Sequence, residues 1–210
     1  MMAFLVICVL AYLIGSIPSS VWVGKIYKGI DVREHGSGNA GATNTFRVLG
    51  KKAGIPVLLL DITKGTIAVN LVWFQTQYGP FPAEIIPYTN LKLAFGFCGV
   101  VGHIFPVFAG FRGGKGIATL LGLLIGLHAV AALYSILVFV IVFITSKYVS
   151  LGSIIASIAF PILVILILGS TNVSLNLFAF FVPILSLITH QKNIERLLRG
   201  EETKVKFGTK

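Results

Sequence analysis

Two polar segments of the sequence combine basic residues with runs of small residues, a combination suited to binding phosphate. The first runs from Gly36 to Arg47 and is rich in Gly, Ser, Thr and Asn. The second is Arg112–Thr119, where two glycines and Lys115 precede an apolar run. Small residues leave backbone N–H groups open to curl around an anion, and arginine can hold one through two hydrogen bonds. Both segments therefore predict an anion site, against the alternatives of a flexible polar loop and a basic turn beside a membrane.

A third polar segment, His190–Glu202, follows the last apolar run of the chain. His190, Asn193 and Arg196 recur at intervals of three, so in a helix they share one face. A histidine beside other polar groups is a candidate general base. The alternative is an amphipathic tail that holds lipid headgroups.

The sequence does not support several well-known motifs for nucleotide binding, metal binding or nucleophilic catalysis. Gly36, Gly38 and Gly41 match GxGxxG, but no βαβ unit surrounds them. The segment around Lys115 lacks the spacing of a phosphate-binding P-loop and the Ser or Thr that follows its lysine. Histidines, cysteines and carboxylates show no metal-ligand spacing, and no Ser–His–Asp set is evident. We expect neither a metal nor a cofactor.

Three ionisable residues stand in apolar context. Asp61 and Lys64 are one helical turn apart, and His103 precedes the Arg112–Thr119 segment. Charges inside a membrane are costly and usually face a partner. We expect Asp61 and Lys64 to pair with each other or with Arg112, and His103 to be a packed residue.

The elements that position these residues are membrane helices. Hydrophobic residues make up 56% of the 210 residues and charged residues only 11%, more apolar surface than a soluble domain can bury. Continuous apolar runs of about 20 residues favour spanning helices over a barrel. We expect an all-α integral membrane protein with a single transmembrane domain, residues 1–210. The predicted helices are Ala3–Val23, Ala53–Gln75, Leu91–Phe108, Leu151–Leu168 and Leu175–Thr189.

The run Ile117–Ser146 is either one long helix or two short ones that break near His128. Charge favours two. Basic residues fill the segment Lys25–Lys52, the Gly110–Gly116 loop and the tail His190–Lys210, whereas the Pro-rich stretch Gly79–Asn90 has none. Seven crossings place all three basic segments on one side, which the positive-inside rule makes cytoplasmic, with the N-terminus outside. One crossing is then short, and Gly122 and Gly126 would let it pack closely on a neighbour.

The net charge of +10 fits this orientation and the attraction of anionic lipids or substrates better than binding of nucleic acid. We expect membrane lipid as a partner, no nucleic acid, and a monomer.

The ordered set of motifs resembles one family, the bacterial acyl-phosphate:glycerol-3-phosphate acyltransferases. The motifs are Gly15–Pro18, Gly36–Asn44 with Arg47, Leu60–Gly65, Gly102–Pro106, Phe111–Thr119 and His190–Asn193. The resemblance covers nearly the whole chain. It implies seven transmembrane helices in the bacterial inner membrane and an active site at the cytoplasmic face. It also implies transfer of an acyl group from acyl phosphate to glycerol 3-phosphate, giving lysophosphatidic acid and inorganic phosphate as the first acylation of phospholipid synthesis.

The resemblance also assigns residues. Ser37, Lys115, His190 and Asn193 correspond to the catalytic set. Substrate and phosphate binding falls to Arg47, Asn44, Gly113, Gly114, Lys115, Ser150, Ser153 and Glu202. The two serines fit the same family position equally well, and Glu202 follows Gly200-Glu where the family usually has Gly-Thr. The general base is either His190 or a substrate phosphate.

Rival hypotheses remain at this point. An acyl-CoA-type acyltransferase needs a His and an Asp five residues apart, and the nearest pair, His190 and Glu195, has the wrong acid. An anion transporter would place its site near the membrane midplane in repeated halves, which the sequence lacks. A lipid-binding scaffold would explain the basic tail but not the glycine-rich loops.

Overall fold

The computed structural model describes residues 2–78 and 86–205, and every regular element in these residues is helical. The chain forms two compact units, which we call unit 1 (Met1–Leu127) and unit 2 (His128–Lys210). Each unit is described by itself. The all-α class is confirmed, whereas the single transmembrane domain stays a prediction.

Unit 1 begins with two helices where the sequence predicted one. In place of Ala3–Val23 the chain forms α1 (Met2–Gly15) and α2 (Ser19–Lys28), so the predicted helix is interrupted, although Met2–Lys28 remains one candidate membrane span. Pro18 has no N–H and disfavours helical backbone at the residue before it. The break leaves the Ile17 carbonyl outside any helix, where it accepts a hydrogen bond from Lys64.

The polar segment Lys25–Lys52 also contains helical structure that was not predicted. A 3-10 turn, η1 (Val32–Glu34), is followed by helix α3 (Ala42–Leu49). The apolar residues of α3 lie on one side, and Gly54 of the next helix packs directly against the ring of Phe46. Tertiary packing therefore makes a helix of a segment whose composition predicted a loop.

The remaining helices of unit 1 lie close to their predicted places, except that the predicted helix Ala53–Gln75 is divided in two at Leu71. They are α4 (Lys51–Asn70), α5 (Val72–Tyr78), α6 (Tyr88–Ile104) and α7 (Ile117–Leu127), with a 3-10 turn, η2 (Val107–Ala109), after α6. The Pro-rich stretch Gly79–Asn90 lies partly outside the described residues, and its last residues begin α6.

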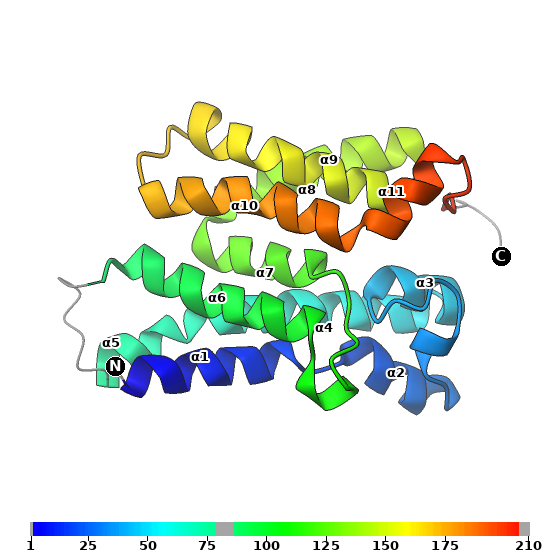
Figure 1. Ribbon diagram of the computed structural model, residues 1–210, viewed down its shortest axis with the longest axis horizontal. Helices are drawn as coiled ribbons and strands as arrows, with labels where there is room; N and C mark the ends of the chain where they lie inside the picture. The colour runs from blue at the N-terminus through cyan, green and yellow to red at the C-terminus, as the bar shows by residue number, and fades with distance from the viewer. Residues whose placement is uncertain (1, 79–85, 206–210) are drawn as a thin grey trace. The chain divides into compact units, whose positions relative to one another are not determined.

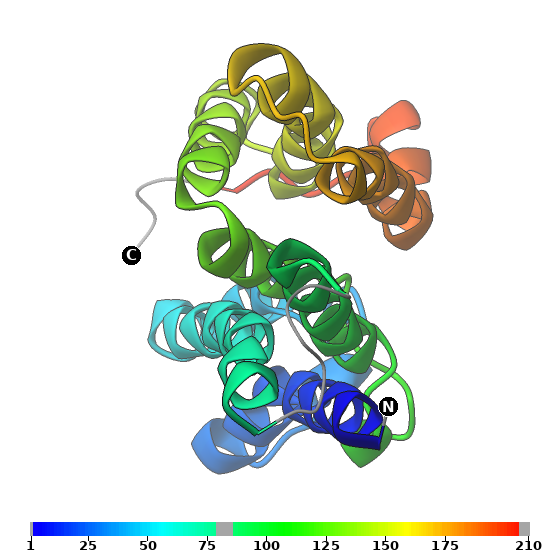
Figure 2. The same cartoon turned by 90° about the vertical axis from the view of Figure 1, so that its left-hand side faces the viewer.

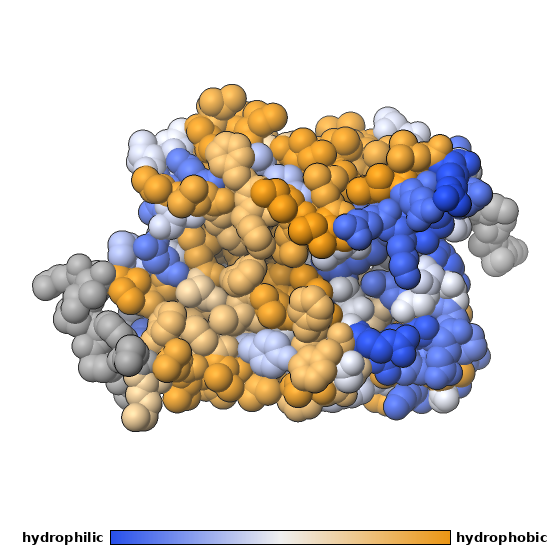
Figure 3. All heavy atoms as spheres, in the orientation of Figure 1, coloured by the Kyte–Doolittle hydropathy of each residue, from blue (hydrophilic) through white to orange (hydrophobic). Residues whose placement is uncertain are grey.

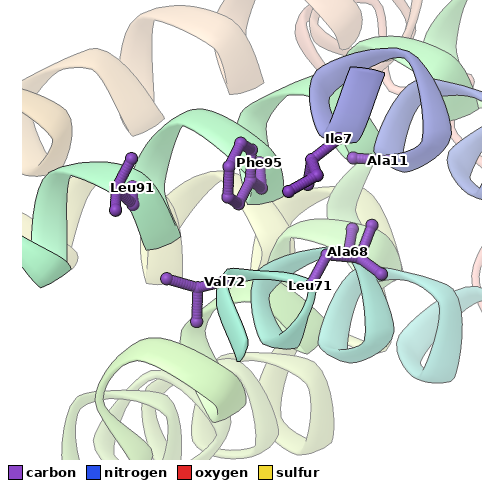
Figure 4. Packing of buried hydrophobic residues seen from close by; sticks show 7 residues of the cluster. All are labelled: Ile7, Ala11, Ala68, Leu71, Val72, Leu91 and Phe95. Atoms are coloured by element: carbon purple, nitrogen blue, oxygen red, sulfur yellow. The ribbon is translucent and has the colours of Figure 1, made fainter. Parts of the chain in front are cut away.

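Helix α4 is the centre of unit 1. It packs against α1, α3, α6 and α7, as Figures 1 and 2 show from two directions. Seven buried residues of α1, α6 and the α4–α5 region form an apolar cluster around Phe95 (Figure 4). Gly65 and Gly122 let α4 and α7 touch backbone to backbone, because a Cβ at either would collide with a carbonyl of the other helix. Close packing of Gly122 and Gly126 on a neighbour is therefore confirmed.

Unit 2 consists of α8 (Ala129–Ser146), α9 (Val149–Ile162), α10 (Val173–Thr189) and α11 (Gln191–Leu198). Helix α9 packs on both α8 and α10 and continues into a π-helical turn, η3 (Leu163–Ile167). The predicted break near His128 is confirmed, and the His128 side chain caps α8 by accepting from the Ala131 N–H at 3.3 Å.

The described helices suit a membrane. Five helical segments are long and apolar enough to span one, when α1–α2, α4–α5, α6–η2 and α9–η3 are each counted as one segment together with α8. A sixth candidate is the pair α10–α11, bent by 67°. Helix α7 is apolar but has only 11 residues. In Figure 3 the most hydrophilic residues of unit 1 gather at the end with α2 and α3, and those of unit 2 at the end with α11. Each unit therefore has an apolar body and one strongly polar end.

Candidate active site

The predicted site residues form two groups, one at the polar end of each unit. Unit 1 carries Ser37, Asn44, Arg47, Gly113, Gly114 and Lys115, and unit 2 carries Ser150, Ser153, His190, Asn193 and Glu202.

Asn44 holds the loop that presents Ser37. It is 1% exposed, and its side-chain oxygen accepts from the Ser37 N–H at 2.8 Å. Its amide nitrogen donates to the carbonyls of Val32 and His35 at 2.8 and 3.0 Å. Gly36 has a φ of +62°, and a Cβ there would collide with the Asn44 side chain. The loop therefore closes tightly around a buried amide, with the Ser37 side chain exposed.

Arg47 lies in the last turn of α3, three residues after Asn44, and is exposed. The same short helix thus carries a buried residue that shapes the loop and an exposed cation beside it. An exposed guanidinium can bind a phosphate through two hydrogen bonds.

The glycine-rich loop is fixed to the end of α6. The N–H groups of Gly113 and Gly114 donate to the carbonyls of Ile104 and His103, both at 3.2 Å. A Cβ on Gly113 would collide with the His103 carbonyl, and one on Gly114 with the His103 ring. These two positions therefore need glycine for close approach rather than for an unusual φ.

This finding changes the expected source of anion-binding N–H groups. Because Gly113 and Gly114 donate to α6, their N–H groups are engaged within the protein. The N–H groups of the first turn of α7, which opens at Ile117, have no partner within the helix. A helix N-terminus favours anions, and the half-buried Lys115 comes two residues before it.

The two loops of unit 1 meet at Gly114. A Cβ placed there would lie 3.1 Å from the carbonyl oxygen of Ala40, in the loop that carries Ser37. The structure therefore brings the two segments that were predicted to bind anions together, as expected if both serve one site.

Arg33, one of the basic residues of the Lys25–Lys52 segment, also links these loops. Its guanidinium pairs with Asp31 at 2.7 Å and donates to the Ala109 carbonyl at 2.6 Å. The hydrogen bond from Arg33 lowers the pKa of Asp31, and the same contact raises the pKa of Arg33. The Asp31–Arg33 spacing in the sequence is a signal that could have revealed this clamp.

Glu202 is the centre of the group in unit 2. Its side chain is 5% exposed and accepts hydrogen bonds from Asn193 at 2.8 Å, Ser150 at 3.1 Å and Arg196 at 2.7 Å. Burial acts to raise the pKa of Glu202, but these three donors outweigh it and the pKa is lowered. The carboxylate is thus ionised at neutral pH and fixes α11 to α9.

The structure also separates the two serines. Ser150 donates to Glu202, whereas Ser153 donates to the carbonyl of Val149 in its own helix at 3.0 Å. Ser150 therefore belongs to the group around Asn193, which the sequence could not decide.

His190 lies at the bend between α10 and α11 and is 3% exposed. Its Nδ1 is 2.9 Å from the carbonyl oxygen of Ser186. Because a carbonyl oxygen can only accept, Nδ1 carries the proton, and in the neutral ring Nε2 then carries the lone pair. This tautomer is the one that a general base uses at Nε2.

Among residues 2–78 and 86–205, no group of three or more His, Cys, Asp or Glu side chains is placed to hold a metal ion. The chemistry available at the two polar ends is thus that of cations, aimed N–H groups, hydroxyls, an amide and an imidazole.

A family model described as glycerol-3-phosphate acyltransferase matches residues 5–200. The chain belongs to the glycerol-3-phosphate acyltransferase family. The glycerol-3-phosphate acyltransferase of Chlorobaculum tepidum is 45% identical, with 100% of both chains covered. That of Chlorobium phaeobacteroides strain BS1 is 43% identical over 99% of this chain and 98% of its own.

Two crystal structures of PlsY (YgiH), an integral membrane glycerol 3-phosphate acyltransferase, share the fold with a TM-score of 0.81 and 37% identity. Each match covers 97% of this chain and 96% of the other. One is a glycerol 3-phosphate form and the other a lysophosphatidic acid form. Our chain is thus an acyltransferase of glycerol 3-phosphate in the membrane, and the family places it in phospholipid biosynthesis. The transporter and scaffold hypotheses are superseded.

Proposed function

We propose that the protein transfers a fatty acyl group from acyl phosphate to the 1-hydroxyl of glycerol 3-phosphate, giving lysophosphatidic acid and inorganic phosphate. The observation that carries the proposal is the joining of two anion-binding loops at Gly114, beside Lys115. The PlsY structures in glycerol 3-phosphate and lysophosphatidic acid forms support the acceptor and the product. The donor is supported by the ordered motif set described above.

The reaction needs little covalent help from the protein. The acceptor oxygen attacks the acyl carbonyl carbon and forms an ester bond. The bond from that carbon to the phosphate oxygen breaks, phosphate leaves with the electron pair, and the hydroxyl proton goes to a base. Because phosphate is a good leaving group, catalysis consists of positioning two anions and stabilising charge on the carbonyl and leaving oxygens.

The proposal assigns a role to each of the site residues. Lys115, Arg47 and the first turn of α7 hold phosphate, with Gly113 and Gly114 setting the loop against α6. Ser37 and Asn193 orient the acceptor or the carbonyl. The remaining members, Asn44, Ser150 and Glu202, act by holding Ser37 and Asn193 in place, and Ser153 has no role beyond its own helix.

The base is either His190 or a substrate phosphate, whose second pKa near 6 suits proton transfer. The Nδ1 contact with Ser186 favours His190, since it leaves the lone pair on Nε2. A His190→Gln variant tests this. If His190 is the base, kcat falls by about a hundredfold or more, with KM for glycerol 3-phosphate within about threefold. If the variant keeps most of the wild-type kcat, a substrate phosphate takes the hydroxyl proton instead.

The same proposal includes the orientation of the protein in the membrane. Seven crossings, counting the short α7 and the α10–α11 pair, put the N-terminus outside and the C-terminus in the cytoplasm of a bacterial inner membrane. The polar end of each unit then faces the cytoplasm. A C-terminal green fluorescent protein fusion should fluoresce, and a C-terminal alkaline phosphatase fusion should be inactive. The opposite result would invert the topology.

The donor assay decides the function. Purified protein is mixed with glycerol 3-phosphate and palmitoyl phosphate, and phosphate release and lysophosphatidic acid are followed together, with palmitoyl-CoA as the control donor. Equal amounts of both products from the acyl phosphate, and none from the thioester, support the proposal. Formation of lysophosphatidic acid from palmitoyl-CoA would instead mean that the protein is an acyl-CoA-dependent acyltransferase. The expected absence of a metal is tested by measuring activity in excess chelator. The expected monomer is tested by light scattering of the purified protein.

A further inference from the structure

A buried ionic cluster in unit 1 joins four of the sequence motifs. Lys64 Nζ lies 2.9 Å from Asp61 Oδ1, so the predicted pairing of these two residues is confirmed. His103 Nδ1 lies 3.5 Å from the same carboxylate oxygen. All three side chains are at most 5% exposed. We call Asp61, Lys64 and His103 the ionic cluster.

The cluster is connected to the break between α1 and α2. Lys64 Nζ donates to the carbonyl oxygen of Ile17 at 2.9 Å, the group that Pro18 leaves outside the helices. The Lys64 ammonium therefore contacts both the Asp61 carboxylate in its own helix and the Ile17 carbonyl at the break between α1 and α2.

On its other side the cluster contacts the glycine-rich loop. The ring of His103 lies so close to Gly114 that a Cβ there would collide with Nε2. The backbone carbonyl of His103 accepts from the Gly114 N–H, and that of Ile104 from the Gly113 N–H. Both the side chain and the main chain of His103 therefore touch the loop directly before Lys115.

Stability is a weak reason for such a cluster. Buried ion pairs cost much desolvation free energy, and apolar residues of similar size often stabilise a protein as well or better. What the cluster does supply is position, because the Asp61 carboxylate lies 3.5 Å from the His103 ring, and the Lys64 ammonium contacts both Asp61 and the α1–α2 break.

We infer that Asp61 and His103 are positioning residues for the phosphate-binding loop: Asp61 holds the His103 ring, and His103 sets Gly113, Gly114 and hence Lys115. This inference rests on the proposed role of that loop. Lys64 neutralises Asp61 and is secondary to the positioning.

Four variants separate positioning from stability. Asp61→Asn leaves Lys64 buried without its carboxylate, so both melting temperature and activity should fall. The double variant Asp61→Asn with Lys64→Gln removes both charges and should recover melting temperature. Its KM for one of the two phosphate-bearing substrates should stay about tenfold or more above wild type, because a displaced loop costs that much, with kcat within about threefold. His103→Asn should give the same KM defect. Glu195→Gln, which breaks an exposed pair with Arg199, is the ionic control and should match wild type.

Hydrogen–deuterium exchange of the peptide that contains Gly113 and Gly114 gives a readout independent of the donor. The amides that donate to His103 and Ile104 should exchange faster in the double variant than in wild type. Recovery of both melting temperature and KM in the double variant, with unchanged exchange, would overturn the inference. Faster exchange in a protein that does not use acyl phosphate would instead refute only the proposed donor.

Discussion

The Ser37 loop of unit 1 and the Asn193 helix of unit 2 are both fixed by a buried polar side chain, but of opposite kinds. Asn44 is neutral and bonds backbone groups of its own segment. Glu202 is ionised and bonds three side chains from α9 and α11. The first arrangement depends on shape and on Gly36, which leaves room for the Asn44 amide. The second depends on charge, so the two ends should respond differently to mutation and to pH.

The largest effect should come from removing the cation of the glycine-rich loop in unit 1. We expect Lys115→Ala to lower kcat/KM by about a hundredfold to a thousandfold, as for loss of a group that stabilises developing negative charge. Steady-state kinetics of the purified variant checks this. Lys52→Ala, which removes an exposed lysine in the first turn of α4, is the matched control and should stay near wild type. Equal activity of Lys115→Ala and wild type would remove Lys115 from the site.

The next largest effects should come from Asn44 and Glu202, which we call the two anchors because each holds part of the site in place. Glu202→Ala should cost about 3 kcal/mol of stability, because it leaves Asn193, Ser150 and Arg196 without their shared acceptor. Asn44→Ala should cost about 2 kcal/mol, since three backbone groups lose a neutral partner. Unfolding in detergent followed by circular dichroism measures both. A larger cost for Asn44→Ala would reverse the expected order of the two anchors.

Acid should distinguish the anchors more sharply. The pKa of Glu202 is lowered from its ordinary value of 4.5, so its contribution is complete above that pH and is lost as the pH falls through the folded value. The stability difference between wild type and Glu202→Gln should be constant from neutral pH down to about 5 and shrink below that. The difference between wild type and Asn44→Ala should not follow this pattern. Parallel pH profiles for the two pairs would contradict the comparison.

The smallest effect concerns the two serines of α9. Ser150→Ala removes one of three donors to Glu202 and should reduce activity about fivefold, through a net hydrogen-bond contribution near 1 kcal/mol. Ser153→Ala breaks a bond within its own helix and should leave kcat/KM unchanged. The opposite ranking would mean that Ser153 contacts substrate directly.

Much of the fold followed from the sequence because membrane helices are specified by long apolar runs. The break at His128 was predictable from charge, since only an added crossing puts all the basic segments on one side. The break at Pro18 and helix α3 were not predicted. The first lies at the short polar stretch Gly15–Ser20 inside an otherwise apolar run, and the second forms because Phe46 packs on Gly54, a contact that composition does not reveal.

The candidate site was predicted in part. The glycines and cations were visible as motifs, but the partners of the Gly113 and Gly114 N–H groups were not, because they come from the end of α6. The choice between Ser150 and Ser153 depended on where the tail folds back, and Glu202 lies 52 positions from Ser150 along the chain. Long-range contacts of this kind need the structure.

The most direct test of the account follows the fate of each phosphate. Purified protein receives acyl phosphate and glycerol 3-phosphate, with radiolabelled phosphorus in one substrate at a time. The account predicts that label from acyl phosphate appears entirely as inorganic phosphate, and label from glycerol 3-phosphate entirely as lysophosphatidic acid, in equal amounts. Label from acyl phosphate in the lipid product, or phosphate release without glycerol 3-phosphate at the full rate, would contradict it.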